Sequence, residues 1–251
     1  MSAVFGNYAR YYDLLYRDKD YAGEVQYVES LIKRYATLET HSILDVGCGT
    51  GVHAARFAEK GYTVYGVDRS DDMIKAAQAR KSVRTKFVVG DAFDFSLDTQ
   101  VDVVVSLFHV MNYHTTNEGL SAVIANVARH LRPGGLFIFD TWYGPAVLTD
   151  RPVVRVKRLE DEAISVRRIA EPVWRANENV IEVHYELLIE DKAHHGVETL
   201  RETHNMRFLF KPEIELLLNA GKMRAIRFEE WMTGKEPSEQ TWGVCCVVVR
   251  E

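Results

Sequence analysis

The sequence predicts an α/β fold: a Rossmann-like seven-stranded sheet with an antiparallel β-meander insertion after strand five. Up to about residue 150, short apolar runs alternate with helical patterns, which is the order of a doubly wound parallel sheet. From residue 151 to 210, apolar residues instead recur at every second position, as in antiparallel strands. We therefore expect one domain made of residues 1–150 and 211–251, with 151–210 as a β-rich insertion.

The first strand is expected at residues 43–46, and it runs into three glycines at alternate positions, Gly47, Gly49 and Gly51. A helical pattern follows directly and is expected to end at Gly61. Glycines let the backbone pass close to a ligand, and the N-terminus of a helix offers unpaired N–H groups. A strand, a glycine turn and a helix in this order predict a nucleotide-binding corner.

The spacing of these glycines and two acids indicate which nucleotide binds. A dinucleotide fingerprint would place its third glycine at Val52, but the glycine comes one residue earlier, at Gly51. Asp45 stands just before the loop, where it would repel a pyrophosphate and attract an ammonium group. Asp68 ends the next strand, residues 62–67, and can accept both hydroxyls of a ribose. An NAD-dependent oxidoreductase is thereby disfavoured.

The run DVGCGTG at residues 45–51, together with Asp68, resembles the first motifs of the class I S-adenosylmethionine (SAM) methyltransferases. The resemblance implies SAM as cofactor, with S-adenosylhomocysteine as its product. It also implies cofactor contacts from Tyr12, Tyr16, Asp45, Gly47, Cys48, Gly49, Asp68, Arg69, Met73, Asp91, Ala92 and Leu107. Without this resemblance, the sequence alone would predict that Met73 is a core residue and that Asp91 is a turn residue.

The rest of the parallel part continues the alternation. Helices are expected at residues 21–35, after the N-cap Ser70, and at 120–131; strands at 86–89, 101–108 and 136–140, the last one after a turn at Pro133-Gly134-Gly135. After the meander, a helix from Pro212 to Gly221 and strands at 223–231 and 242–249 complete the sheet.

His109, Tyr113 and His114 follow the fourth strand directly, at residues 101–108. Ligands of open α/β sheets bind beyond the carboxyl ends of the strands, so these are candidate catalytic residues. A structural or solvent-facing role is the alternative for either histidine.

The N-terminal residues 5–16 are dense in tyrosine, which fits a helix covering the core or a lid over a cationic cofactor. The pattern Y-A-x-x-Y-D-x-x-Y, followed by K-D-Y at 19–21, is similar to the amino-sugar N,N-dimethyltransferases of the desosamine type, which act on TDP-linked sugars. This resemblance implies that Tyr12 lies beside the reacting group. It also implies that the insertion covers the substrate and helps to form a homodimer.

One departure from these enzymes concerns the phosphates of the substrate. Trp242-Gly243 stands where they carry an arginine next to a glycine that reaches the nucleotide phosphates. A tryptophan cannot neutralise a pyrophosphate. This departure points to another glycan precursor as the substrate, or to a phosphate-bearing intermediate held by Arg155, Arg167 and Arg168 of the insertion.

The function expected is methyl transfer from SAM to a small molecule: the amino group of a nucleotide-linked sugar or a related polysaccharide precursor. An amine only has to be uncharged when it attacks, whereas a hydroxyl requires a base such as His109 or His114. O-methylation of a hydroxyl or phosphate-bearing precursor is therefore the alternative. A non-catalytic SAM-fold binding module is a third reading.

Composition excludes several classes of function. The 251 residues are 47% hydrophobic and carry a net charge of −5, which argues against nucleic acid or an anionic membrane as partner, and against a nucleic-acid methyltransferase. The three cysteines, Cys48, Cys245 and Cys246, show no metal-ligand spacing and fit a reducing, cytoplasmic location. Neither a signal peptide nor a membrane-spanning run is expected.

Overall fold

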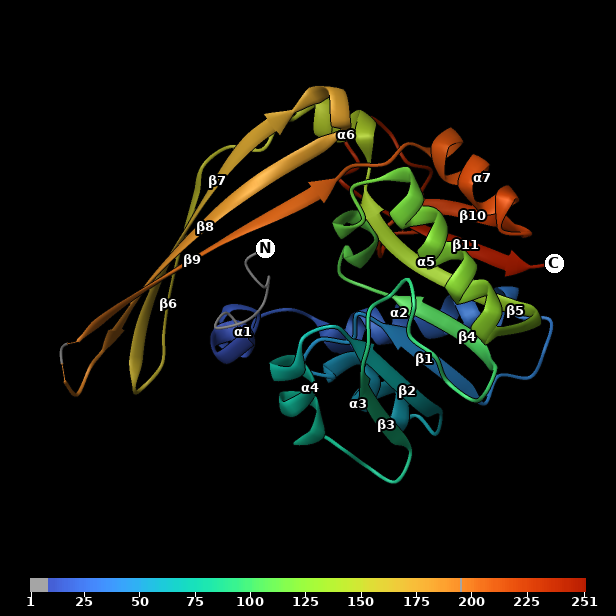
Figure 1. The fold of residues 1–251 in the computed structure, drawn as a ribbon, viewed down its shortest axis with the longest axis horizontal. Helices are drawn as coiled ribbons and strands as arrows, with labels where there is room; N and C mark the ends of the chain where they lie inside the picture. Colours follow the sequence, from blue (N-terminus) through green and yellow to red (C-terminus); the bar gives the residue numbers. More distant parts are fainter. Residues whose placement is uncertain (1–8, 195) are drawn as a thin grey trace.

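A seven-stranded sheet forms the centre of the computed structural model, which describes residues 9–194 and 196–251 (Figure 1). Five neighbouring strands are parallel, and the last two strands of the chain pair antiparallel at one edge. In spatial order the strands are β10 (Met223–Glu230), β11 (Gly243–Arg250), β5 (Leu131–Trp142), β4 (Val101–Ser106), β1 (Ser42–Val46), β2 (Thr63–Asp68) and β3 (Thr85–Val89). The predicted Rossmann-like sheet is confirmed.

Helices cover both faces of this sheet and bury its apolar strands. On one face lie α2 (Tyr21–Tyr35), α3 (Val52–Glu59) and α4 (Asp71–Gln78), and on the other α5 (Asn117–His130) and α7 (Lys211–Ala220). Successive residues of a strand point to opposite faces, so the adjacent free thiols Cys245 and Cys246 pack in different layers. Within the described chain, no helix is long and apolar enough to cross a membrane.

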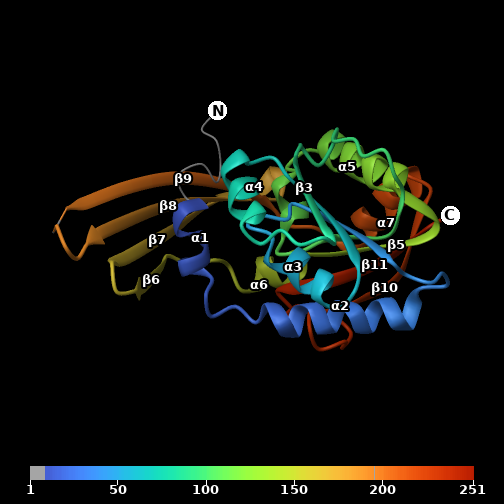
Figure 2. The same cartoon turned by 90° about the horizontal axis from the view of Figure 1, so that it is seen from below.

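The segment after β5 forms a second sheet, which we call the arm. Its four antiparallel strands are, in spatial order, β6 (Arg155–Glu160), β7 (Ile164–Arg175), β8 (Val180–Asp191) and β9 (Val197–Arg207). The arm extends away from the central sheet, and α1 (Ala9–Leu15) lies between the two (Figures 1 and 2). The predicted meander is thus confirmed. Residues 5–8 of the predicted N-terminal helix lie outside the described residues.

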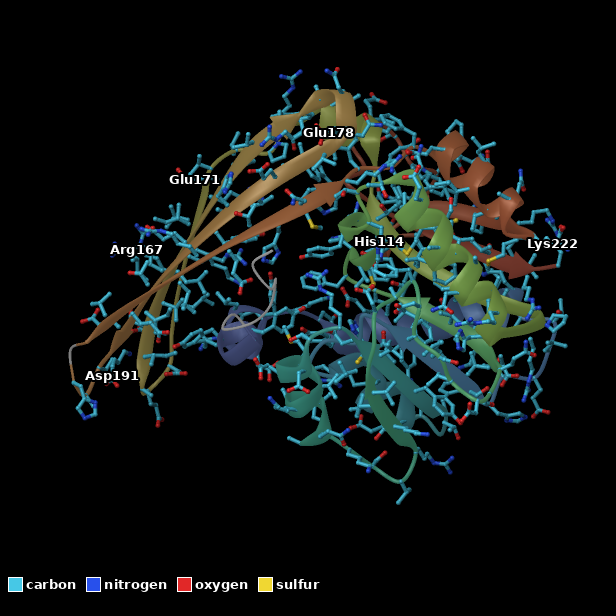
Figure 3. All side chains as sticks on the ribbon, viewed as in Figure 1. His114, Arg167, Glu171, Glu178, Asp191 and Lys222 are labelled. Carbon is cyan, nitrogen blue, oxygen red and sulfur yellow. The ribbon has the colours of Figure 1, made fainter. Side chains whose placement is uncertain are left out.

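The two faces of the arm differ. On β7, Val166 and Arg168 face inward, whereas Figure 3 shows Arg167 and Glu171 on the side turned away from α1. Pro172 lies within β7, where a proline would normally break the hydrogen bonding of an inner strand. The pairing of β6 ends at Ala170, so β7 is an edge strand on that side at Pro172 and needs no N–H there.

Three local features differ from the predictions. The Pro-Gly-Gly turn lies inside β5 as an irregularity: Val101 pairs with Leu131, but Val103 pairs with Leu136, so the intervening residues are extruded from the register. The helix expected to begin at residue 120 begins at Asn117, because the Thr116 side chain accepts a hydrogen bond from the Gly119 N–H and caps it. The short α6 (Gly144–Thr149), which connects β5 to the arm, was not predicted.

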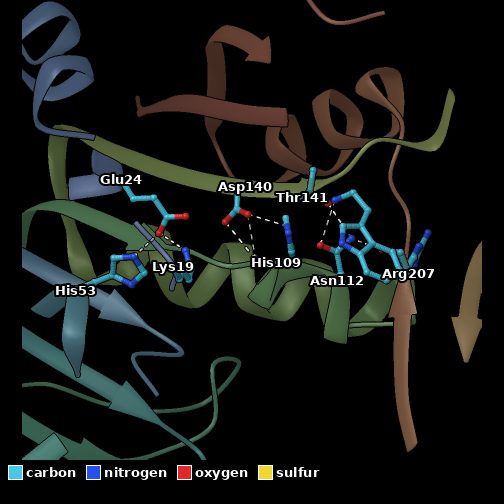
Figure 4. Close-up of polar contacts among 9 residues, drawn as sticks. Lys19, Glu24, His53, His109, Asn112, Asp140, Thr141 and Arg207 are labelled. Atoms are coloured by element: carbon cyan, nitrogen blue, oxygen red, sulfur yellow. Dashed lines mark hydrogen bonds and ion pairs between the residues drawn. The ribbon is translucent and has the colours of Figure 1, made fainter. Parts of the chain in front are cut away.

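Asn112, in the 3-10 turn after β4 (Val110–Tyr113), joins the arm to the central sheet. Its side chain is fully buried, and its Nδ2 donates to Thr141 Oγ1 at 3.0 Å and to the carbonyl oxygen of Arg207, the last residue of β9 (Figure 4). Its Oδ1 accepts from the Trp142 N–H at 3.3 Å. One amide therefore connects the loop after β4, strand β5 and the arm.

We expect Asn112→Ala to lower the free energy of unfolding by about 2 kcal/mol or more, because each buried polar group left without a partner costs about 1–3 kcal/mol. Urea unfolding measures this difference. Asn219→Ala, at an exposed position near the end of α7, is the matched control and should change stability by less than about 0.5 kcal/mol. Equal stability of the two variants would show that the hydrogen bonds of Asn112 do not stabilise the connection between the arm and the central sheet.

Candidate active site

A cavity of about 510 Å³ lies at the carboxyl ends of the parallel strands, between the central sheet, α1 and the arm. Most residues expected in the site line it: Tyr12, Tyr16, Gly47, Gly49, Asp68, Arg69, Met73, Asp91, Ala92, Leu107, His109, Tyr113 and His114. The arm contributes Arg155, Arg168, Tyr185, His204 and Met206. Residues from distant parts of the chain therefore share one enclosed space.

The glycine turn between β1 and α3 forms one wall of this cavity. Gly47 has φ +75° and donates its N–H to the Val67 carbonyl at 2.8 Å, and a Cβ on it would come within 2.6 Å of the Val110 side chain. Gly49 has φ +53°, and a Cβ there would meet nothing within 4 Å. The backbone at Gly49 is thus open on its cavity side, as close approach of a ligand requires.

Asp68, at the end of β2, is held in a fixed orientation by two backbone donors. Its Oδ2 accepts the Gly49 N–H at 2.9 Å and its Oδ1 accepts the Ser70 N–H at 2.8 Å. Burial raises the pKa of the Asp68 carboxyl, and these two hydrogen bonds oppose the rise. The carboxylate lines the cavity and keeps acceptor capacity for a ligand, since each oxygen has a further lone pair.

Asp45 and Cys48, both expected in the cofactor site, do not line the cavity wall. Cys48 packs in the core, where its Sγ would lie 3.0 Å from a Cβ built on Gly66. Asp45 is only 1% exposed, and no hydrogen bond to its Oδ2 is found within the described part of the chain. Burial raises its pKa to about 6, so the carboxyl forms a buried negative charge behind the glycine turn at neutral pH.

Helix α1 covers the opening and is attached on both sides. Asp13 accepts hydrogen bonds from Thr50 Oγ1 at 2.8 Å and from Arg80 Nη2 at 2.6 Å, which ties the helix to the glycine turn and to the turn just after α4. Toward the arm, Lys157 Nζ donates to the Leu15 carbonyl at 2.7 Å. Tyr11 Oη donates to Glu198 Oε2 at 2.9 Å.

Because α1 is held in this way, its two cavity tyrosines form an aromatic wall. The rings of Tyr12 and Tyr16 lie 4.6 Å apart, and Tyr16 meets Phe108 edge-on at 4.9 Å. All three residues line the cavity. The negative faces of aromatic rings attract a cation.

The loop after β4 presents His109 on a strained backbone. Phe108 and His109 have φ of +69° and +64°, which non-glycine residues rarely adopt. The buried Asp140 at the end of β5 holds this conformation: it accepts the His109 N–H, and its Oδ2 lies 2.7 Å from His109 Nδ1 (Figure 4). The short distance places the carboxylate charge beside the ring, but the Nδ1 contact lacks the geometry of a hydrogen bond, so the firm attachment of this residue is through its backbone N–H.

The other two candidate catalytic residues of this loop, His114 and Tyr113, lie in different environments. His114 lies between the arm and the central sheet (Figure 3), and no partner for its Nε2 is found among the residues described. Burial lowers its pKa to about 4, so it is neutral at pH 7. Tyr113 contacts the arm through a 2.8 Å hydrogen bond between its Oη and His204 Nδ1. Burial raises the pKa of Tyr113, so the phenol is also neutral.

The sequence analysis did not identify all of the residues that line the cavity. Trp142, Tyr185, His204 and Met206 line the cavity, and none of them was predicted as a site residue. The sequence signal was the two-residue spacing of Glu202 and His204, which puts a histidine and an acid on the same face of β9. Arg155 and Arg168 reach the cavity as expected, whereas Arg167 is exposed on the opposite face of β7.

The comparisons with known proteins agree with this geometry. A family model described as a methyltransferase domain matches residues 43–135. A SAM-dependent methyltransferase of Clostridium acetobutylicum has the same fold, with a TM-score of 0.82, 19% identity and coverage of 98% of this chain and 99% of that one. DesVI of Streptomyces venezuelae superposes with a TM-score of 0.81 at 28% identity, over 97% and 98% of the two chains. Fold and site define a class I SAM-dependent methyltransferase.

Two curated relatives narrow this class. The dTDP-3-amino-3,4,6-trideoxy-alpha-D-glucopyranose N,N-dimethyltransferase of Streptomyces venezuelae is 32% identical over 231 residues, which cover 91% of this chain and 95% of the relative. The dTDP-3-amino-3,6-dideoxy-alpha-D-glucopyranose N,N-dimethyltransferase of Streptomyces fradiae is 28% identical over 217 residues, 86% and 83% of the two chains. This chain belongs to the family of these N,N-dimethyltransferases.

The residues around the glycine turn fit SAM. The buried Asp45, whose Oδ2 has no partner among the described residues, places a negative charge behind the glycine turn, and such a charge favours a ligand that carries an ammonium group. The backbone at Gly49 leaves room for a ligand to approach. Asp68 would hold the ribose hydroxyls, and the aromatic wall of Tyr12, Tyr16 and Phe108 suits a sulfonium. The donor set of this end of the cavity therefore matches the groups of the cofactor.

We expect Asp68→Ala to weaken the binding of S-adenosylhomocysteine at least about tenfold, because each charge-assisted hydrogen bond is worth about 1.5–3 kcal/mol. Titration calorimetry measures the affinity. Asp72→Ala is the control, since Asp72 is an exposed acid in the first turn of α4 whose Oδ1 accepts a hydrogen bond from Lys75 at 3.1 Å. An unchanged affinity in Asp68→Ala would remove Asp68 from the cofactor site.

The raised pKa of Asp45 predicts that the free energy of unfolding depends on pH. Its pKa in the folded protein, about 6, lies above the ordinary 3.8, so its contribution to stability is complete below about pH 4 and is lost as pH rises through about 6. The free energy of unfolding of the native protein should therefore fall relative to that of Asp45→Asn over this interval. Urea unfolding at a series of pH values tests this. Parallel curves for the two proteins would contradict a raised pKa.

Proposed function

We propose that the protein transfers methyl groups from SAM to the amino group of a nucleotide-linked sugar. The observation that carries the proposal is the division of charge in one cavity. The end at the glycine turn carries more acids than bases, with Asp68, Asp91 and Arg69 in the wall and Asp45 buried behind it, whereas the end at the arm carries Arg155 and Arg168. An acidic end suits a cationic cofactor, and arginines suit the diphosphate of a nucleotide sugar.

Arg168 is built into the cavity wall. Its Nη1 donates to Tyr16 Oη at 3.2 Å, and its guanidinium carbon lies 5.1 Å from the centre of the Tyr185 ring. Stacking on an aromatic ring holds a guanidinium flat, and its fork of N–H groups can then bind a phosphate with two hydrogen bonds. The arginine that this chain lacks beside Gly243 is thus replaced from the arm.

SAM, when bound, supplies a methyl group activated by its sulfonium. The chain's own residues then have to align the acceptor and exclude water, and such positioning can lower a barrier by about 7–11 kcal/mol in favourable cases. Tyr12 and Tyr16 from α1 and Tyr113 from the loop after β4 are the groups proposed to orient the acceptor, because all three line the same cavity.

We propose that the two sheets have different roles, one in binding the cofactor and the other in covering the substrate. Residues 1–150 and 211–251 are proposed as the SAM-binding domain, and residues 151–210 as the substrate cover. All four arm strands contribute to the wall, through Arg155, Arg168, Tyr185 and His204, and none of these lies at the glycine turn.

A homodimer through the outer face of the arm is the proposed assembly. Val156, Val173 and Val197 are 47%, 42% and 65% exposed on that face. Exposed apolar residues on one face of a sheet favour association. Light scattering that gives only the mass of a monomer would contradict the dimer.

We further infer a cytoplasmic location, where the free thiols of Cys48, Cys245 and Cys246 stay reduced.

The direct test is turnover of SAM with a matched pair of nucleotide sugars. The dTDP-linked 3-amino sugar named for the Streptomyces venezuelae relative should yield N-methylated product and S-adenosylhomocysteine. The same sugar with a 3-hydroxyl is the control and should yield neither. NMR of the product locates the methyl group.

O-methylation is the second candidate, and one observation favours it. His109, with its Nδ1 2.7 Å from the Asp140 carboxylate, is the arrangement that a hydroxyl acceptor needs as general base. In the matched pair of sugars, methylation of the hydroxyl sugar alone would select this candidate and reject the amine.

Adjacent arginines on β7 allow a sharp test of the phosphate contact. Arg168→Gln should raise the KM for the nucleotide sugar at least about tenfold, since charge-assisted hydrogen bonds are worth about 1.5–3 kcal/mol. The affinity for S-adenosylhomocysteine should not change. Arg167→Gln, which alters the outer face of the same strand, should leave both unchanged. Equal KM values for the two variants would exclude a phosphate site at Arg168.

A further inference from the structure

The function proposed above makes no use of His114 Nε2, a buried polar atom at the cavity. This nitrogen is shielded from solvent, and no hydrogen-bond partner for it is found in the described part of the chain. Burial lowers the pKa of the imidazole to about 4, so the ring is neutral at pH 7, with one N–H donor and one acceptor nitrogen. Because a buried polar atom without a partner lowers stability, its presence at a cavity indicates a partner from outside the chain.

The backbone on both sides of His114 holds the residue in place. Its N–H donates to the Met111 carbonyl at 3.3 Å and closes the 3-10 turn after β4, and two residues later Thr116 caps α5. The buried amide of Asn112 fastens the same turn to β5 and to the arm. The imidazole is therefore presented to the cavity from a fixed position, as the recognition of a small ligand requires.

The neighbours of His114 place it beside the segments that follow β2 and β3. Its ring meets the Phe93 ring edge-on, with 6.4 Å between the centroids, and Phe93 follows Asp91 by two residues. The charges of Asp91 and Arg69 both act on the imidazole. All four residues line the cavity. His114 thus belongs to the same end of the cavity as the acid that follows β3.

The acids at this end form a series that follows the order of the groups in SAM. Asp68 interacts electrostatically with Asp45 and with Asp91, and Asp91 interacts in turn with His114. In SAM the ribose separates the amino-acid part from the adenine. With the ribose hydroxyls at Asp68 and the ammonium group attracted by Asp45, the adenine falls beside Asp91 and His114.

We propose that His114 is a cofactor-binding residue whose Nε2 forms a hydrogen bond with the adenine ring of SAM. A purine with an amino group offers both donors and acceptors, and a neutral imidazole can supply the complementary partner for either. The Phe93 ring, 44% exposed, adds an apolar surface beside the same position. The inference concerns the cofactor and holds whatever the methyl acceptor is. It replaces the catalytic role that the sequence predicted for His114.

Calorimetry with the free enzyme tests the contact. His114→Phe keeps a ring and removes both nitrogens, and it should weaken the binding of S-adenosylhomocysteine about threefold to tenfold, the effect of one neutral hydrogen bond. The same factor is expected for 5′-methylthioadenosine, which lacks the amino-acid part. His41→Phe is the matched control, because His41 is exposed and precedes β1 at the opposite edge of the sheet. Unchanged affinity for either ligand in His114→Phe would overturn the proposal.

Urea unfolding of the free enzyme separates ligand binding from a structural role. His114→Phe should be at least as stable as the native protein, because the substitution removes a buried polar atom that has no partner in the described chain. Weaker binding without a loss of stability is the result expected of a residue kept for its ligand. Loss of stability together with loss of affinity would instead show a structural role and overturn the proposal.

NMR and kinetics distinguish the cofactor from the acceptor. In enzyme with ¹⁵N-labelled histidine, S-adenosylhomocysteine should shift the His114 Nε2 resonance, and the dTDP-linked 3-amino sugar alone should not. A shift caused only by the sugar would assign His114 to the acceptor and overturn the proposal. So would a fall in kcat of about 10²-fold or more with unchanged affinity for S-adenosylhomocysteine, which would identify a general base. If the native enzyme methylates neither sugar of the matched pair, the proposed function fails, and the binding measurements still decide the role of His114.

Discussion

The attachment of helix α1 on both sides determines the geometry of the whole site. Asp13 fastens the helix to the glycine turn through Thr50 and to the turn just after α4 through Arg80. The Leu15 carbonyl fastens it to the arm through Lys157. A helix of seven residues has little stability by itself, so these tertiary contacts keep it in place. The aromatic wall, the roof of the cavity and the position of the arm all depend on them.

Two buried carboxylates at strand ends then orient the chemistry of the loops. Asp68 is held by N–H groups of the glycine turn and of the residue before α4, and Asp140 holds the backbone of His109. In both places a carboxylate at the carboxyl end of a strand organises the polypeptide that follows another strand. The sheet thus transmits its rigidity to loops that would otherwise have several conformations.

The sequence predicted the central sheet well, and it predicted that the glycine turn and Asp68 lie at the same edge of the sheet, because these features depend on local patterns. The glycine turn and Asp68 follow their strands directly, so strand order alone brings them together. The arm was harder. The two-residue period predicted strands but could not show whether Arg167 or Arg168 points inward, since a register shift of one residue exchanges the faces. The contact between Tyr113 and His204 spans 91 positions, and no local pattern encodes it.

The short β6 has a consequence for the behaviour of the protein in solution. Before β6 begins, the last part of β7 (residues 171–175), at the end of the arm nearer α6, has no strand paired with it on that side, and unpaired edges invite strands of other molecules to add to them. Pro172 removes one N–H from this edge, and the charged Glu171 and Arg175 flank it. Sheet proteins use these devices to prevent aggregation. The arm can therefore project far from the central sheet and remain a poor template for amyloid-like growth.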